Sequence, residues 1–260
     1  MTVPILEPLQ KSTLADWLAT DTGRYLLEWE KGQVDQAVED VFGFNALQIG
    51  LPGVDFLAAN RMPLRFYAGP EAGGSLIADP TRLPVATHSL DLLVLPHVLE
   101  FCSDPHQVLR EAERVLMPEG QIVICGFNPF SLWGLKSLLY QRRPGYPWRG
   151  EFVALSRLRD WLKLLGFELN GGKFGCYAPA FQSAAWLQRF SFMEAAGDRW
   201  WPIAGAVYVV RAVKRVPGMR RVTPAWRRER RKVHAVASVA RRAQLHLVNA
   251  TAEPDKADER

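Results

Sequence analysis

The stretch from Leu76 to Gly126 constrains the fold of this chain more than any other, because it alternates short apolar runs with one charged helical pattern. The apolar runs begin at Leu76, at Leu92 and at Gln121, and the helical pattern, Gln107–Leu116, lies between the second and the third. Strands that alternate with helices over such short links predict a parallel sheet built from right-handed crossovers. Ligands of such sheets bind beyond the carboxyl ends of the strands. We therefore expect an α/β protein whose functional residues follow its strands.

Apolar runs on both sides of this stretch extend the predicted sheet to seven strands. The further strands are expected at residues 44–49, 63–68, 167–169 and 206–213. A short helix through Asn60 is expected between the first two of these strands. Residues 130–140 form a hydrophobic segment, and one more helical pattern covers residues 155–165.

The first 43 residues are predicted to form a helical preface. Apolar residues recur near helical spacing as far as Val41, Thr22-Gly23 interrupts the pattern, and Gly43 ends it. The predicted organisation is therefore a preface at residues 1–43, a sheet domain at 44–215 with an insertion at 171–202, and a basic tail at 216–260.

Positive charge is concentrated toward the end of the chain. Between Arg211 and Arg242 there are twelve Lys and Arg residues and one acid, whereas the whole chain has a net charge of +5. Apolar residues near helical spacing predict a basic amphipathic helix at about residues 227–247. Such a helix suits contact with nucleic acid, contact with an anionic membrane surface, or docking on the body as a solubilising appendage. The sequence leaves these three alternatives open.

Composition argues against several classes of protein. Hydrophobic residues make up 48% of the 260 residues, which is ample for a core. No apolar run approaches the roughly 20 residues of a membrane span, and the start of the chain lacks an apolar signal core, so we expect a cytoplasmic location. The three cysteines have no close partner in sequence, so neither a disulfide framework nor a metal site is predicted.

Several short motifs follow one another in the middle of the chain. They are Ala78-Asp79, Leu83-Pro84, Ser89-Leu90-Asp91, His97-Val98-Leu99-Glu100, Asp104-Pro105, Leu109-Arg110-Glu111, Arg114-Val115-Leu116 and Pro118-Glu119-Gly120. In their order and spacing they resemble the class I S-adenosylmethionine-dependent methyltransferases, an uncharacterised bacterial branch of them most closely. The resemblance implies a Rossmann-like seven-stranded sheet with flanking helices. It also implies S-adenosylmethionine as cofactor and methyl transfer to a small molecule or a modified macromolecule.

The resemblance also implies which residues contact the cofactor. Glycines after the first strand let the backbone approach the methionine carboxylate, and a carboxylate after the third strand accepts from the adenine amino group. The residues in these roles, with those beside the adenine and the methionine, are Gly50, Leu51, Gly53, Asp79, Pro80, Leu83, Leu95 and Pro96. An alternative for Asp79 is a turn-forming aspartate that binds only its own backbone.

His97 is the candidate catalytic residue, because it is the histidine that follows a predicted strand. An imidazole titrates near neutrality and could remove the proton that methyl transfer to oxygen or nitrogen releases. Contact with a ligand, or packing alone, are the alternatives. Aromatic residues expected near the same edge could line an acceptor pocket or belong to the core: Phe127, Phe130, Trp133, Tyr146 and Trp148. Asn128-Pro129 is interpreted as a turn.

The chain departs from the family pattern at three places. Gln48 stands where the first motif has an acid, and Pro52 stands where it has a glycine, which removes a backbone donor. The acid that binds the ribose hydroxyls is missing from the end of the second strand, and Glu71 is the nearest substitute. We therefore expect modest cofactor affinity, and we expect the change Ala68→Asp to tighten binding.

Two other functions compete with the methyltransferase. A degenerate member of the family could keep the fold as a binding scaffold and act through its basic tail, and the altered first motif supports this alternative. A nicotinamide dehydrogenase would require Gly-x-Gly-x-x-Gly after the first strand, and Gly50-Leu51-Pro52-Gly53 does not fit that pattern.

Overall fold

A computed structural model describes residues 14–69, 75–140, 150–180, 184–190 and 192–216 of the chain. These residues belong to one compact unit that ends at Val216. The predicted helix of the basic tail and the candidate Glu71 lie outside the described residues. Among the described residues, no helix combines the length and the hydropathy needed to cross a membrane.

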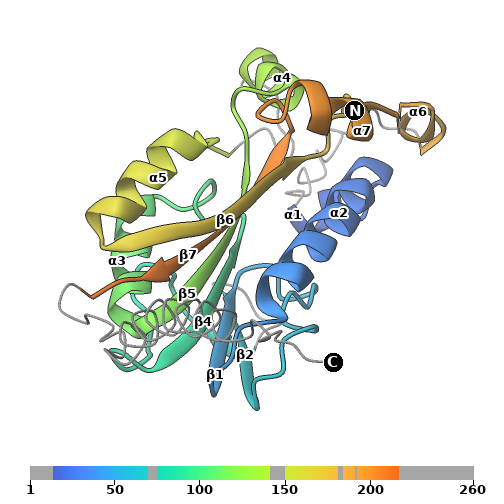
Figure 1. The fold of residues 1–260 in the computed structure, drawn as a ribbon. Helices are drawn as coiled ribbons and strands as arrows, with labels where there is room; N and C mark the ends of the chain where they lie inside the picture. Colours follow the sequence, from blue (N-terminus) through green and yellow to red (C-terminus); the bar gives the residue numbers. More distant parts are fainter. Residues whose placement is uncertain (1–13, 70–74, 141–149, 181–183, 191, 217–260) are drawn as a thin grey trace, which may run out of the picture. The chain divides into compact units, whose positions relative to one another are not determined.

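The core of the molecule is a seven-stranded sheet with the order β3-β2-β1-β4-β5-β7-β6 (Figure 1). The strands are β1 Asn45–Ile49, β2 Leu64–Gly69, β3 Leu76–Ile77, β4 Leu90–Pro96, β5 Leu116–Phe127, β6 Phe167–Gly175 and β7 Val207–Lys214. Strands β1 to β5 pair in parallel, whereas β7 runs antiparallel to both β5 and β6. The predicted class I methyltransferase sheet is confirmed.

Seven helices are present in the described part of the chain. They are α1 Leu14–Leu18, α2 Asp21–Val38, α3 Pro105–Val115, α4 Leu132–Tyr140, α5 Leu155–Leu164, α6 Ala184–Arg189 and α7 Phe192–Trp200. The break predicted at Thr22-Gly23 is wrong, because α2 begins at Asp21 and Thr20 caps it by accepting from the Gly23 N–H. A Cβ at Gly23 would overlap the carbonyl oxygen of Trp17, so this glycine allows α1 and α2 to pack closely.

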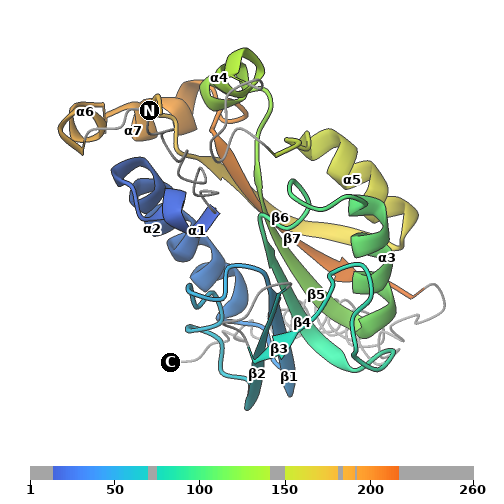
Figure 2. The ribbon, with the colours of Figure 1, turned by 180° about the vertical axis from the view of Figure 1, so that it is seen from behind.

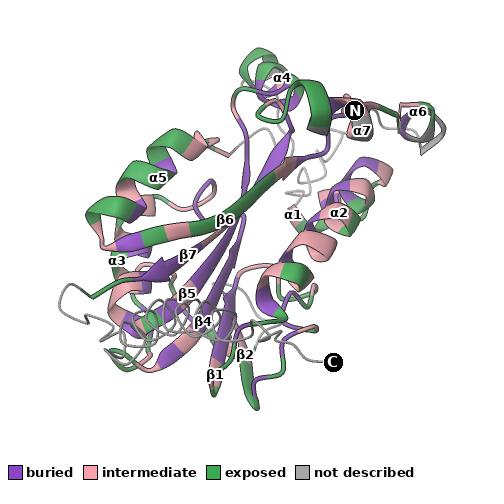
Figure 3. Ribbon diagram, viewed as in Figure 1, coloured by how far each residue is buried: buried purple, intermediate pink, exposed green. Residues whose placement is uncertain are grey.

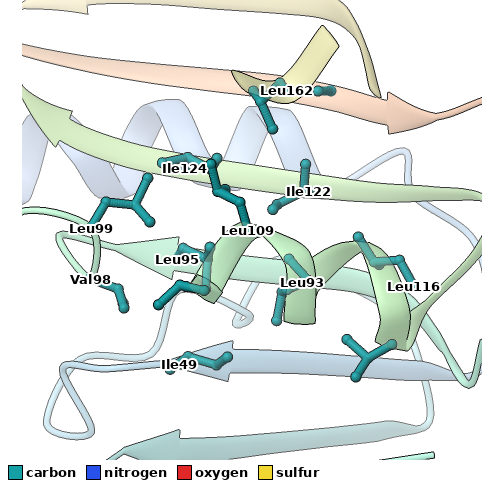
Figure 4. Packing of buried hydrophobic residues seen from close by; sticks show 14 of the residues in the cluster. Ile49, Leu93, Leu95, Val98, Leu99, Leu109, Leu116, Ile122, Ile124 and Leu162 are labelled. Carbon is teal, nitrogen blue, oxygen red and sulfur yellow. The ribbon is translucent and has the colours of Figure 1, made fainter. Parts of the chain in front are cut away.

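Helices α3 and α5 lie on one face of the sheet and α2 lies on the other (Figures 1 and 2). The α3 face holds the larger apolar cluster, in which side chains of β1, β4, β5 and α3 pack together (Figure 4). The central strands are buried almost throughout, as Figure 3 shows. Buried on both sides, they have the continuous apolar sequences from which the sequence analysis predicted them.

The helix predicted through Asn60 is absent, and residues 51–63 follow an irregular path over the α2 face. Phe56, Leu57 and Met62 in this segment are buried against the apolar side of α2. Asn60 is also buried, and its amide donates to the carbonyls of Val38 (2.8 Å) and Val41 (3.1 Å). These contacts hold the irregular segment against the end of α2.

The predicted insertion at 171–202 begins later than expected. Strand β6 continues through Gly171-Gly172 to Gly175 and pairs with β7 over its whole length, with one irregularity near Asn170. The sequence analysis treated the two glycines as the end of the strand, but pairing with β7 satisfies their backbone groups. Helices α6 and α7 follow beyond this strand.

Candidate active site

The loop after β1 and the turn after β4 meet at the carboxyl edge of the sheet. Gly50 has φ of +85° and its N–H donates to the carbonyl of Ala68 at the end of β2 (2.7 Å). A Cβ at Gly50 would lie 3.2 Å from a methyl group of Val98 and 3.5 Å from the carbonyl oxygen of Pro96. Any other residue would be strained and crowded there, so this glycine lets the two segments come together.

Gln48 is fully buried and organises the loop after β1. Its Nε2 group donates to the carbonyls of Gly50 (3.1 Å), Leu51 (3.2 Å) and Val54 (2.7 Å). Its Oε1 atom accepts from the Phe56 N–H (2.9 Å). Because the loop directs three carbonyl oxygens at this side chain, the position requires a donor, which a carboxylate does not provide. The residue that departs from the family motif is therefore the residue that holds this loop.

Gly53 and Gly69 lie at the carboxyl edge of the sheet, where Gly53 is exposed and Gly69 is buried. Among the described residues, a Cβ at either glycine would meet no atom within 4 Å. Ala68, in contrast, is 1% exposed and belongs to the apolar cluster on the α3 face. The change Ala68→Asp would bury an unpaired carboxylate in this core, so it is expected to destabilise the fold. Gly69 is buried as well, but it is the position of the β2 end where an added Cβ finds room.

Asp79 is exposed and forms a turn with Thr81. Its Oδ1 atom accepts from both the N–H and the hydroxyl of Thr81, at 2.8 Å each. These hydrogen bonds hold the pKa of Asp79 below its ordinary value. Its Oδ2 atom has no hydrogen bond within the described part of the chain, so the carboxylate keeps a free acceptor at the end of β3. The turn does not exclude a cofactor contact. Pro80 follows it and is half-buried.

The remaining predicted contacts next to the strands lie inside the protein. Leu95 is fully buried and Leu83 is 6% exposed, and both belong to the α3-face cluster. The backbone of Leu83 is held by α3, because its N–H donates to Glu111 Oε2 (3.1 Å) and its carbonyl accepts from Arg114 (3.0 Å). Pro96 is buried as well, although its carbonyl faces the Gly50 loop. These side chains support the site more than they line it.

His97 lies in a buried group of charges that the sequence analysis did not predict. Its Nε2 atom is 2.8 Å from Glu30 Oε1 on α2, and its Nδ1 atom is 3.2 Å from Glu100 Oε1. The first contact is an ion pair without the alignment of a hydrogen bond, while Glu100 Oε1 also accepts from the Phe127 N–H at 2.7 Å. We call Glu30, His97 and Glu100 the triad. The side chains of the triad are at most 1% exposed.

The two carboxylates decide the charge of His97. Burial alone would lower its pKa, but Glu30 and Glu100 outweigh this effect and raise the pKa to about 10. His97 is therefore an imidazolium at neutral pH. Its φ of +54° is unusual for a residue with a side chain, and its ring stacks on Phe127 with centroids 4.3 Å apart. The charge contacts and the ring stacking thus hold the turn after β4 and offset the strain of its backbone.

The aromatic candidates separate into core and surface. Phe127 and Trp133 are buried in a third apolar cluster, whereas Phe130 is 74% exposed. Asn128 forms the predicted turn: its amide donates to the carbonyls of Ile203 (2.8 Å) and Gly205 (2.9 Å). Tyr146 and Trp148 lie outside the described residues. In the part of the chain that the structure describes, no group of three His, Cys, Asp or Glu side chains could hold a metal ion.

Sequence analysis missed Glu30 and Gln48 as site residues. Glu30 occupies the buried stripe of α2, one helical turn from Leu26 and from Val34. A glutamate in an apolar stripe is a signal that could have identified it, because an unpaired carboxylate is not stable there. Gln48 could not have been identified in this way, because its four hydrogen bonds depend on the path of the loop.

Three comparisons relate the chain to known proteins. Residues 57–124 match a family described as a methyltransferase domain. The chain is 39% identical over 138 residues to the uncharacterized protein YafS of Escherichia coli, covering 52% of this chain and 57% of that protein. It is 32% identical over 111 residues to the malonyl-[acyl-carrier protein] O-methyltransferase of a Methylovorus species, covering 43% of this chain and 37% of that protein. The matched part of the chain thus spans 57% of the length of the first of these curated relatives and 37% of the length of the second.

Solved structures share the fold at low identity. One is an S-adenosylmethionine-dependent methyltransferase of Thermotoga maritima, with a TM-score of 0.53 and 18% identity over 74% of this chain and 92% of that one. Another is from Archaeoglobus fulgidus, with a TM-score of 0.52 and 17% identity over 72% of this chain and 94% of that one. At this identity the agreement concerns the fold.

Proposed function

We propose that this chain, which belongs by its fold and its domain match to the class I S-adenosylmethionine-dependent methyltransferases, transfers a methyl group from that cofactor to an acceptor. The observation that carries the proposal is the loop after β1. The side chain of Gln48 holds this loop by hydrogen bonds, and a Cβ at its Gly53 would meet no described atom within 4 Å. Its Gly50 allows the loop to pack closely against the turn after β4. A loop held in this way supports binding, so the scaffold alternative loses its main argument, the erosion of the first motif.

The residues at the carboxyl edge fit the cofactor. When bound, S-adenosylmethionine supplies an electrophilic methyl group, and transfer leaves the bonding electron pair on sulfur. Gly53 leaves room for the methionine end beside the loop, and Asp79 Oδ2 offers an acceptor for the adenine amino group. Gly69 lies at the end of β2, the place that the resemblance assigns to the residue that binds the ribose.

His97 does not suit the role of general base in the state that the structure shows. An imidazolium has no lone pair with which to accept a proton, and the ring is closed off from solvent. We propose instead that His97 positions the turn after β4, and that alignment of methyl donor and acceptor supplies the rate enhancement. The proton released by an oxygen or nitrogen acceptor would then pass to solvent.

Calorimetric titration of the purified chain with S-adenosylmethionine tests the proposed function. We expect saturable binding of one equivalent, with affinity in the micromolar to millimolar range typical of enzyme cofactors and substrates. Absence of binding at millimolar cofactor, with the chain folded by circular dichroism, would contradict the proposal and favour the scaffold alternative.

Asp79→Asn should weaken S-adenosylmethionine binding about tenfold, because the amide nitrogen that replaces Oδ2 cannot accept from the adenine amino group, so a charge-assisted hydrogen bond is lost. Asparagine keeps the oxygen that accepts from Thr81, so the turn survives. Asp160→Asn, on the exposed surface of α5, is the matched control. Equal affinity of Asp79→Asn and the control would assign Asp79 to the turn alone.

Gly69→Asp should tighten cofactor binding about threefold to tenfold. The change adds a carboxylate at the end of β2, where a Cβ would meet no atom of the described residues within 4 Å, and a carboxylate can accept from both ribose hydroxyls. Calorimetry measures the gain, and Ala68→Asp is the comparison, since that change is expected to destabilise the chain without improving affinity. Unchanged affinity in a folded Gly69→Asp variant would show that the ribose lies elsewhere.

A further inference from the structure

The triad places a net charge inside the protein at the edge of the candidate site. Two carboxylates flank one imidazolium, so the formal charges of Glu30, His97 and Glu100 sum to −1. The Oε2 atoms of both glutamates are buried and have no hydrogen-bond partner in the described part of the chain. This charge is therefore not neutralised locally by the residues that the structure describes.

The other titratable side chains around the triad are uncharged. They are Cys125 on β5, Tyr208 on β7, Cys176 after β6 and the half-buried Cys102, and burial raises the pKa of each one above its ordinary value. No cation other than His97 forms an ion pair with Glu30 or Glu100 among the described residues. The field of the triad is thus that of a single negative charge in a medium of low dielectric constant.

The turn that carries two members of the triad packs against the loop after β1. These members, His97 and Glu100, bracket Val98, whose methyl group limits the space at Gly50. Glu30 reaches the same turn from α2 and lies outside the matched methyltransferase segment, residues 57–124. Helix α2 thus contributes a charged residue, Glu30, to the carboxyl edge of the sheet.

Burying three ionisable groups is unfavourable for stability, since each loses several kcal/mol of hydration, and apolar residues of the same size are often no less stable. A functional role therefore explains their position better than a contribution to stability does. The methyl donor, S-adenosylmethionine, carries a positive charge on its sulfur. The product, S-adenosylhomocysteine, is a thioether with no charge on sulfur. A negative charge near this edge would distinguish the two.

We propose that Glu30 is a specificity residue, which, through the net negative charge of the triad, makes the site bind S-adenosylmethionine in preference to S-adenosylhomocysteine. This inference rests on the proposed function. It assigns to the preface helix a part in favouring the methyl donor and releasing the demethylated product.

The test measures the ratio of the two affinities by calorimetry at pH 6, where His97 is protonated. Glu30→Gln changes the net charge of the triad from −1 to 0, so we expect the preference for S-adenosylmethionine to fall about tenfold. This is the order expected for one unit charge acting across a cofactor site at an effective dielectric constant of about 20. The double variant Glu30→Gln with His97→Gln returns the net charge to −1, and we expect it to recover most of the preference.

Glu28→Gln is the matched control, because it removes an equal charge from the exposed side of the same helix. The imidazole resonances of His97, followed by NMR, report its protonation in wild type and in Glu30→Gln. Equal weakening of both ligands in Glu30→Gln, or no recovery in the double variant, would overturn the inference and leave the triad a structural device. Failure of wild type to bind either ligand would instead contradict the proposed function.

Discussion

Gln48→Glu is expected to destabilise the fold by about 3 kcal/mol, although it restores the acid of the resembled motif. The carboxylate would face the carbonyls of Gly50, Leu51 and Val54 at 2.7–3.2 Å without a hydrogen to donate. A buried charge with unpaired acceptors around it loses both its hydration and its hydrogen bonds. Urea denaturation followed by fluorescence measures the change in the free energy of unfolding.

Gln36→Glu, on an exposed position of α2, is the control and should change stability by less than about 0.5 kcal/mol. Lowering the pH should recover part of the loss in Gln48→Glu, since a neutral carboxyl regains one donor. A Gln48→Glu variant as stable as wild type, with tighter cofactor binding, would contradict the role that we assign to Gln48.

His97→Gln is expected to lower the free energy of unfolding by about 3–5 kcal/mol, because it leaves Glu30 and Glu100 buried without their cation. Adding Glu30→Gln should restore part of this loss, since one of the two uncompensated charges disappears. The double-mutant cycle, measured by urea denaturation, therefore gives a favourable coupling between the two positions. Independent, additive losses would show that the ion pair does not contribute.

His88→Gln is the matched control for this cycle. His88 has a similar backbone conformation, with φ of +53°, but its side chain is exposed and belongs to no ion pair within the described part of the chain. We expect a change of less than about 1 kcal/mol. A loss as large as that of His97→Gln would assign the effect to the strained backbone and not to the charges.

The same ion pairs predict how stability depends on pH. The pKa of His97 is raised in the folded chain, from 6.5 to about 10, so the folded state binds the proton more tightly than the unfolded state. The stabilisation is complete below about pH 6.5 and is lost progressively as the pH rises toward 10. The free energy of unfolding of wild type should therefore fall over this interval more steeply than that of His97→Gln. Equal slopes would exclude a charged His97 in the native state.

Sequence alone determined the architecture of this protein, because its main signals are local. Continuous apolar runs such as Leu92–Leu95 mark strands that are buried on both faces, and a charged stripe beside apolar residues marks α3. The order of these segments admits few topologies, since crossovers are short and right-handed. The same order placed Gly50, Asp79 and His97 at the carboxyl ends of strands, where the structure has them.

Tertiary structure alone decided what those residues do. Glu30 and His97 are 67 positions apart in sequence, and only the packing of α2 against the sheet makes them an ion pair and turns a candidate base into a cation. Gln48 looked like the loss of an acid until the path of the loop showed three carbonyls facing it. The sequence predicted a helix around Asn60, but this segment is irregular and contacts the end of α2. Local pattern sets which surfaces are apolar, whereas the charge and the partners of a buried polar group depend on groups that only folding brings within a few ångströms of it.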